Sequence, residues 1–190
     1  DFPPLQGKRI IALPGRLSRL KGHHHLVTLI RQLKARGITD VAGIIVGGKD
    51  PQHDSYVSKL KASIDEAGLH DEIVFTDHRT DMREIYAVST LVLAVSNKAE
   101  SFGRTALEPL SIGTPTVGFD LGGVGEILAA LFPSGRVPNQ DSQALVDTVA
   151  GLLTAPMPPI APNTEFLLSS MCEHTLQTYA ELVSQEETQQ

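Results

Sequence analysis

Cysteine, tryptophan and long apolar runs are the scarcest features of this chain. It has one cysteine in 190 residues, Cys172, and no tryptophan. A single cysteine excludes an internal disulfide and favours a reducing compartment, so we expect a cytoplasmic protein. No apolar run approaches the roughly 20 residues that a membrane-spanning helix needs, and no segment reads as a signal peptide.

The chain also lacks an excess of positive charge. It has 16 lysines and arginines against 22 aspartates and glutamates, a formal charge of -6. Affinity for a phosphate backbone needs a basic surface, so the balance argues against a dedicated nucleic-acid binder. A local basic pocket for one small anion remains compatible with it.

Several ligand-binding patterns are missing as well. The glycine pattern of dinucleotide-binding Rossmann domains and the Gly-Lys-Ser/Thr of a P-loop are both absent. No Asp-x-Asp pair is present to hold Mg²⁺ or Mn²⁺, so we expect no metal. His23, His24 and His25 do not change this expectation, because consecutive side chains on a helix point about 100° apart and cannot converge on one ion. We expect them to be exposed or half-buried helix residues.

What the chain does contain is an alternation of apolar runs and amphipathic segments. Apolar stripes at helical spacing, such as Leu26, Leu29, Ile30 and Leu33, separate short runs that are apolar throughout. Such runs are typical of strands covered on both faces. The alternation predicts an α/β fold, a Rossmann-like doubly wound parallel sheet of six strands. The expected strands are Lys8 to Leu13, Val41 to Val46, Glu72 to Thr76, Leu91 to Ser96, Pro115 to Phe119 and Gly135 to Val137.

Residues 155–163 contain four prolines and cannot continue a helix. They predict a stiff connector to a last amphipathic segment, Thr164 to Val183. We therefore expect residues 1–163 to form the ligand-binding unit and residues 164–190 to be the C-terminal helix and tail of the same domain.

Ligands of an open α/β sheet bind beyond the carboxyl ends of its strands, which directs attention to the loops there. After the first strand, Gly15 allows a close backbone approach, and Arg16 and Lys21 place two positive charges beside a helix N-terminus. Cations are unfavourable at that end of a helix unless an anion joins them. The alternative is a solvated basic loop.

The loop after the fourth strand carries Glu100 and leads into a helix expected from about Arg104 to Ile112, with Glu108 in its early turns. The N-terminal amides of that helix, near Gly103, form a second cradle for an anion. Carboxylates accept several hydrogen bonds and suit vicinal hydroxyls. A phosphate between two polyols describes a sugar nucleotide. The alternatives are a solvated acid at Glu100 and a helix-dipole carboxylate at Glu108.

These motifs resemble the carboxyl-terminal domain of retaining GT-B glycosyltransferases of family 4, the "glycosyl transferases group 1". The resemblance covers nearly the whole chain. It rests on Gly15-Arg16-Leu17 with Lys21-Gly22, on Glu100-Ser-Phe-Gly-x4-Glu108 followed by Gly113-Thr-Pro-Thr-Val117, on Gly122-Gly123-x-x-Glu126, and on Gly135 with Val137-Pro138.

The resemblance implies a hexosyl transfer from a nucleoside diphosphate sugar, with UDP favoured, to an acceptor glycan or lipid in lipopolysaccharide or polysaccharide synthesis. Arg16, Lys21 and Glu100 would be the catalytic residues: Arg16 and Lys21 neutralise the diphosphate and Glu100 holds the hydroxyls of the transferred sugar. Glu108 would hold the ribose. The other donor-binding residues would be Gly15, His78, Arg79, Ser101, Phe102, Gly103 and Arg104. Relatives often carry glycine where Asp77 stands, which puts the base contact of that loop in doubt.

Enzymes of this family pair two such domains, and the acceptor binds the amino-terminal one. The chain opens at Asp1 without a methionine, and we expect it to be the donor-binding half of a longer enzyme, inactive alone. The final helix would reach back to the other domain. The full-length form can associate with the inner membrane face, although this acidic chain shows no basic amphipathic anchor.

Three rival interpretations remain open at this stage. The first is another enzyme on paired GT-B domains, a nucleotide-sugar epimerase or a pyridoxal-phosphate-dependent phosphorylase. The second is a stand-alone, non-catalytic nucleotide-binding module. The third is a flavodoxin-like domain whose two glutamates are ordinary surface acids.

Overall fold

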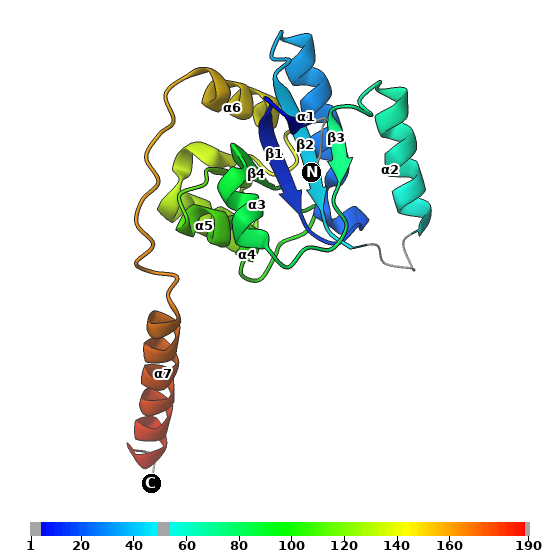
Figure 1. The fold of residues 1–190 in the computed structure, drawn as a ribbon. Coiled ribbons are helices and arrows are strands. Elements are labelled where there is room, and N and C mark those ends of the chain that lie inside the picture. Colours follow the sequence, from blue (N-terminus) through cyan, green and yellow to red (C-terminus); the bar gives the residue numbers. More distant parts are fainter. Residues whose placement is uncertain (1–4, 49–53, 189–190) are drawn as a thin grey trace.

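The computed structural model describes residues 5–48 and 54–188, which include one sheet of six parallel strands. The strand order is β3-β2-β1-β4-β5-β6, the arrangement of a doubly wound Rossmann-like fold, as predicted (Figure 1). Each expected strand is present within two residues of its predicted bounds. The strands are β1 Arg9–Pro14, β2 Val41–Val46, β3 Ile73–Phe75, β4 Leu91–Ala94, β5 Thr116–Phe119 and β6 Arg136–Val137.

Both faces of the sheet are covered, which explains why the strands are apolar throughout. Ile11 and Leu13 are buried in the larger core cluster, whereas Ala12, between them, lies in a smaller one. Side chains alternate between the two faces of a strand, so a strand with helices on both sides has no polar face. The continuous apolar runs of the sequence follow from this burial.

The connecting helices lie on the two sides of the sheet (Figure 1). Helix α3 contributes Ile85 and Tyr86 to the smaller cluster, and the larger cluster takes residues from α1, α2, α4, α5 and α6. The helices are α1 His23–Ala35, α2 Asp54–Glu66, α3 Met82–Val88, α4 Arg104–Ser111, α5 Gly122–Leu131, α6 Ser142–Thr154 and α7 Leu168–Thr188, with short 3-10 turns η2 Arg19–Lys21 and η4 Pro133–Gly135.

The chain reverses its direction of winding between β1 and β4. These strands are neighbours, with Ile11 opposite Leu91 and Ala12 opposite Val92. After β1 the chain crosses to β2 on one side, and after β4 it crosses to β5 on the other. The loops that follow β1 and β4 therefore diverge and leave a crevice at the carboxyl edge, the usual ligand position of such a sheet.

Two helices differ from the expectations. Helix α5 was not predicted, because its early turns, Gly122 to Gly125, carry three glycines and mask the helical pattern of the apolar run that follows. Helix α7 begins at Leu168 and ends at Thr188, later than the expected Thr164 to Val183. The connector continues irregularly through Leu167, and Asn163 accepts a hydrogen bond there from the Phe166 amide at 3.0 Å.

Helix α7 extends away from the sheet and its helices (Figure 1). Its apolar side chains are largely exposed, from Leu168 at 74% to Tyr179 at 63%. A helix that exposes its apolar face gains little from burial within this chain.

The first prediction concerns Gly22, which has a φ of 70° at the start of α1. A Cβ there would lie 2.1 Å from the Val95 carbonyl oxygen just after β4. We expect Gly22→Ala to lower the free energy of unfolding by about 3 kcal/mol, because backbone atoms must move. Chemical denaturation measures the change.

Gly37→Ala is the matched control. Gly37 also has a positive φ, 83°, but a Cβ there would meet nothing within 4 Å. It should lose only the backbone strain, about 1 kcal/mol. Equal losses in the two variants would show that the contact with Val95 carries no cost.

Candidate functional site

The loop after β1 turns sharply at Gly15. Its φ is 141°, and a Cβ there would lie 3.0 Å from the Lys21 side chain. The position directly after β2 also requires a glycine, because a Cβ on Gly47 would lie 2.0 Å from the Gly15 carbonyl oxygen. Gly15 thus lets the loop fold back so that Lys21, at the end of η2, points toward the loop after β4.

Hydrogen bonds join the loops that follow β1 and β4. The Asn97 amide donates to the Leu20 carbonyl at 2.8 Å, and the Asn97 side-chain Nδ2 donates to the Arg19 carbonyl at 2.6 Å. On its other side, Asn97 Oδ1 lies 3.2 Å from Nε2 of His25. Asn97 was not among the candidate residues predicted from the sequence. Its position just after a strand was the only signal that it could join the two loops.

This closure brings Lys21 and Glu100 into direct contact. Lys21 Nζ lies 2.6 Å from Glu100 Oε1, and the Ser96 hydroxyl donates to the same oxygen at 2.5 Å. Burial acts to raise the pKa of Glu100, but the hydrogen bonds from Lys21 and Ser96 outweigh it and hold the pKa below its ordinary value. Glu100 is therefore an ionised carboxylate at neutral pH. Lys21, the cation that the sequence placed beside the N-terminus of α1, thus has the Glu100 carboxylate as its partner.

The turn into α4 is held by close backbone packing. Gly103 is the N-cap, with a φ of 94°. The Gly123 amide donates to the Glu100 carbonyl at 2.9 Å, and a Cβ on Gly123 would lie 2.1 Å from the Phe102 carbonyl oxygen. The loop is thereby pressed against the start of α5. The Ala106 amide donates to the Gly103 carbonyl at 2.9 Å, so the two amides before it, at Arg104 and Thr105, lie ahead of the first hydrogen bond of α4.

Glu108 lies one turn into α4 with both carboxylate oxygens engaged. Arg104, four residues earlier, donates from Nε to Oε1 at 2.8 Å. The hydroxyl of Tyr86, on α3, donates to Oε2 at 3.1 Å. This role of Tyr86 was not predicted, because in the sequence Tyr86 follows Met82 and Ile85 at helical spacing and resembles an ordinary apolar residue of a helix.

These residues line one hollow of about 440 Å³ at the carboxyl edge of the sheet. Seven of its eight lining residues are among the candidate site residues taken from the sequence, and the eighth is Thr105. The structure thus brings the Lys21 side of the crevice and the two glutamates together. The lining residues are Lys21, Glu100, Ser101, Phe102, Gly103, Arg104, Thr105 and Glu108.

Four candidate residues do not line this hollow: Gly15, which shapes the loop after β1, and Arg16, His78 and Arg79. Arg16 is exposed on the loop after β1 and has no ion-pair partner among the described residues. His78 lies beside Gly48 at the end of β2, and Arg79 pairs with Asp81. Asp77 has a φ of 55°, a left-handed conformation in which glycine is unstrained. The residues to which the sequence assigned the base contact thus lie outside the lining of the hollow.

Two of the three histidines differ from expectation. His24 is exposed, but His23 and His25 are buried, at 0% and 6% exposure. His23 Nδ1 lies 3.2 Å from the Tyr56 hydroxyl, and the His25 ring packs edge-on against Phe119. Burial lowers the pKa of both to about 4, so both are neutral at pH 7. They are core residues that support the loop after β1.

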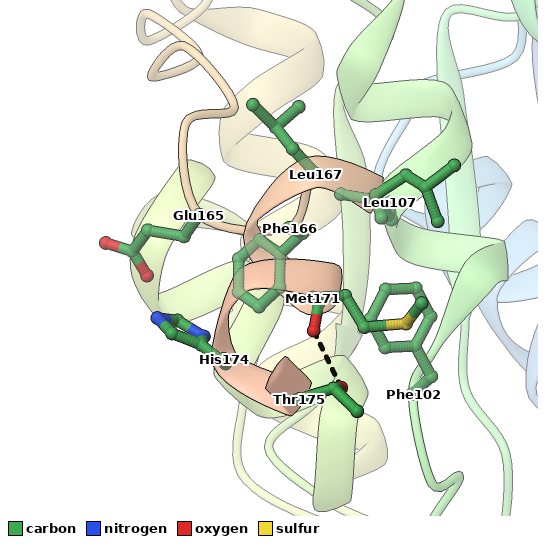
Figure 2. Close-up of a pocket in the computed structure, with 9 residues that line it drawn as sticks. Phe102, Leu107, Glu165, Phe166, Leu167, Met171, His174 and Thr175 are labelled. Carbon is green, nitrogen blue, oxygen red and sulfur yellow. Dashed lines mark hydrogen bonds between the residues drawn. The ribbon is translucent and has the colours of Figure 1, made fainter. Parts of the chain in front are cut away.

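A second hollow, of about 530 Å³, lies between α4 and the start of α7 (Figure 2). Phe102 borders both hollows and meets Phe166 edge-on, with 6.4 Å between ring centroids. The second hollow is lined mainly by apolar side chains, including Leu107 and Met171, and it lacks a fixed pair of charges. The first hollow is therefore the candidate for polar chemistry.

A family model described as "Glycosyl transferases group 1" matches residues 2–163. The chain belongs to this family. Among its curated relatives, a lipopolysaccharide core biosynthesis mannosyltransferase, LpcC of Rhizobium leguminosarum bv. viciae, is 29% identical over 157 residues. That match covers 83% of this chain and 44% of LpcC, so the chain spans less than half of this relative.

Solved structures place the chain in the same fold. Anabaena HepE, solved in complex with UDP and glucose, matches with a TM-score of 0.73 and 26% identity over 79% of this chain and 40% of HepE. The C-terminal domain of a group 1 glycosyltransferase, LpcC of Francisella tularensis, gives 0.65 at 23% identity over 78% of this chain and 76% of that domain. The chain is thus one Rossmann-like half of a GT-B fold.

Neither a metal-binding cluster nor a membrane-spanning helix is found among the described residues. Within residues 5–48 and 54–188, no group of three histidine, cysteine, aspartate or glutamate side chains is placed to hold a metal ion. None of the helices in these ranges is both long enough and apolar enough to cross a bilayer.

The second prediction concerns the Lys21–Glu100 pair. We expect Lys21→Met to raise the pKa of Glu100, because burial is then opposed by Ser96 alone. A pKa lowered in the folded state adds stability above the ordinary pKa of a glutamate, and this stability is lost as the pH falls through the lowered value. Lys21→Met should therefore lose less stability on acidification than the wild type. Carboxyl NMR titration and acid unfolding measure the two effects.

Lys98→Met is the matched control, since Lys98 is exposed on the same loop and makes no ion pair among the described residues. Its titration should follow the wild type. An unchanged Glu100 pKa in Lys21→Met would mean that the pair is not formed in solution.

Proposed function

We propose that this chain is the donor-binding half of a retaining, metal-independent glycosyltransferase of family 4. It binds a nucleoside diphosphate sugar, with UDP favoured, and presents the sugar to an acceptor glycan or lipid. The observation that carries the proposal is the meeting of Lys21, Glu100 and the N-terminus of α4 in one hollow, with Glu108 at its wall.

The charges of the site favour a dianionic group. Within the hollow, Lys21 pairs with Glu100 and Arg104 pairs with Glu108, so its charges balance. Arg16, which is exposed on the loop after β1 and lies outside the lining of the hollow, is a further cation with no ion-pair partner among the described residues. The unpartnered amides at the start of α4 add partial positive charge. A diphosphate between Arg16, Lys21 and these amides would meet positive potential on several sides.

The two carboxylates then suit the polyols at either end of the diphosphate. Glu100 is ionised and retains an oxygen, Oε2, that no hydrogen bond of the described residues occupies. Lys21 has three donors, so it can keep Glu100 in place while it binds a phosphate oxygen. Glu108, further along α4, would take the hydroxyls of the ribose.

In the proposed reaction the bond between the anomeric carbon and the β-phosphate oxygen breaks, and a bond to the acceptor oxygen forms. The nucleoside diphosphate leaves with the bonding electron pair, and its departing β-phosphate oxygen takes up the proton that the acceptor hydroxyl loses. Charge develops on the β-phosphate, where fixed cations and helix amides stabilise it most. This stabilisation needs no metal ion.

Two relatives support the choice of donor and pathway. HepE, 26% identical to this chain, was solved with UDP and glucose. LpcC of Rhizobium leguminosarum acts in lipopolysaccharide core biosynthesis. We therefore propose UDP as the nucleotide carrier and a surface polysaccharide or lipopolysaccharide as the product.

The third prediction is that the chain binds UDP more tightly than GDP or ADP in calorimetric titration. Arg16→Ala and Glu108→Ala should each weaken UDP binding about tenfold to a hundredfold, because each removes charge-assisted hydrogen bonds. EDTA should leave the affinity unchanged.

Arg31→Ala is the control for Arg16→Ala, because Arg31 is an exposed arginine on α1 that does not line the hollow. It should bind UDP as the wild type does. Absence of binding to all three nucleotides would refute the proposal and favour an ordinary flavodoxin-like domain. Loss of binding in EDTA would refute metal independence.

We further propose that α7 packs against the amino-terminal domain of the full-length enzyme. Its apolar side chains lie on one broad face, including Leu168, Met171, Leu176 and Tyr179, all more than half exposed. A matching domain would bury this face and supply the acceptor site. The full-length enzyme could then meet a lipid acceptor at the inner membrane face.

The fourth prediction is that the isolated chain binds a donor but transfers no sugar. The acceptor site would lie on the other domain, so incubation with UDP-glucose and candidate acceptors should give no glycosylated product by mass spectrometry. The full-length enzyme, assayed in parallel, is the positive control. Transfer by the isolated chain would contradict the two-domain arrangement.

A further inference from the structure

Glu108 is held by two partners of opposite character. Arg104 lies on the same helix, four residues away, and its side chain is 80% exposed. Tyr86 lies on α3 and is 3% exposed. An exposed ion pair between helix neighbours is weak and exchanges readily with solvent, whereas a hydrogen bond from a buried phenol is shielded from water.

The Tyr86 ring cannot easily turn away from Glu108. It belongs to the smaller core cluster, with Ile44, Val46 and Val92 of the sheet. Its backbone carbonyl accepts a hydrogen bond from the Thr114 hydroxyl at 2.9 Å, beyond the C-terminal end of α4. Tyr86 thus holds α4 at two places, the Glu108 carboxylate and the turn that follows the helix.

The phenol also remains a donor at physiological pH. Burial, and then the negative charge of Glu108, raise the pKa of Tyr86 well above its ordinary value. A protonated hydroxyl beside an ionised carboxylate can only donate to it. Oε2 of Glu108 therefore accepts a hydrogen bond from the buried phenol, and Oε1 accepts one from the exposed Arg104, a partner that can leave.

Glu108 stands between two hollows. On one side is the hollow with Lys21 and Glu100, and on the other is one of about 570 Å³ between α3 and α4, which includes Met82 and Ile112. Tyr86 lines only the second, while Arg104 and Glu108 line both. Among the described residues, the Tyr86 hydroxyl is the hydrogen-bond partner that Glu108 has on α3. It holds Oε2 on the α3 side and leaves Oε1 to Arg104.

We propose that Tyr86 is a positioning residue that fixes the Glu108 carboxylate for a ribose diol, and that the diol displaces Arg104. This inference rests on the proposed function, in which Glu108 binds the ribose. Arg104 is then the displaceable partner that covers Oε1 until a ligand arrives, and Tyr86 is the permanent one. Selectivity for ribose over deoxyribose depends on Tyr86, although its hydroxyl contacts no ligand.

The fifth prediction is tested by titrating UDP and 2′-deoxy-UDP into the wild type and Tyr86→Phe. We expect the wild type to prefer UDP. Tyr86→Phe should weaken UDP binding about threefold to tenfold, with little effect on 2′-deoxy-UDP, so the ratio of the two dissociation constants falls toward one. A merely structural role would weaken both nucleotides alike and leave the ratio unchanged.

Tyr56→Phe is the matched control. Its hydroxyl is also hydrogen-bonded, to His23, but lies away from Glu108. It should keep the wild-type ratio. Thermal melting establishes that each variant is folded. If Tyr86→Phe does not fold, Arg104→Ala replaces it, because it removes the partner that the ribose diol is proposed to displace. A ratio that shifts further toward UDP supports the inference, and an unchanged or smaller ratio overturns it.

The remaining outcomes separate the two proposals. A wild-type ratio in folded Tyr86→Phe overturns the role of Tyr86 and leaves donor binding intact. Equal binding of UDP and 2′-deoxy-UDP by the wild type overturns the ribose contact together with Tyr86, but leaves diphosphate binding. A wild type that binds neither nucleotide overturns the proposed function and this inference together.

Discussion

The contact between the loops that follow β1 and β4 is the constraint on which the site depends. Asn97 joins them through the carbonyls of Arg19 and Leu20, and the Lys21–Glu100 pair lies next to these hydrogen bonds. These loops diverge from neighbouring strands, so without the cross-links the crevice between them would have no defined width. Gly22 makes this approach possible, because a Cβ there would meet the Val95 carbonyl oxygen. Gly15 and Gly47 let the loop after β1 fold back, because a Cβ would meet the Lys21 side chain at Gly15 and the Gly15 carbonyl oxygen at Gly47.

The charged side chains of the site are paired with one another. Each cation of the hollow faces a carboxylate, and the Lys21–Glu100 pair joins residues that the proposed function assigns to different parts of one ligand. Such pairing stabilises ionised carboxylates in a partly buried place, where an isolated charge would be costly. A ligand would exchange these contacts for its own phosphates and hydroxyls, so the residues are already oriented when it arrives.

Much of the fold was open to prediction because its signals are local. Strand bounds and the doubly wound parallel sheet follow from apolar runs that alternate with helical stripes. The failures have local causes too. Three glycines in the early turns masked α5. Helix α7 was shifted because Phe166 and Leu167, which belong to the irregular connector, continue the apolar pattern of the helix toward its N-terminal side. His23 and His25 were expected at or near the surface, since a polar residue type gives no sign that a loop will cover it.

The sequence by itself determined which chemical groups stand at the strand ends: Arg16 and Lys21 after β1, Glu100 after β4 and Glu108 one turn into the next helix. That much follows because chain position and strand periodicity are local properties. Only the tertiary structure decided which of these groups meet, that Arg79 pairs with Asp81 instead of facing the hollow, and that Ser96 and Tyr86 hold the two glutamates. Which side chains meet depends on how the loops fold and how the helices pack across the sheet. No periodicity in the sequence encodes those contacts.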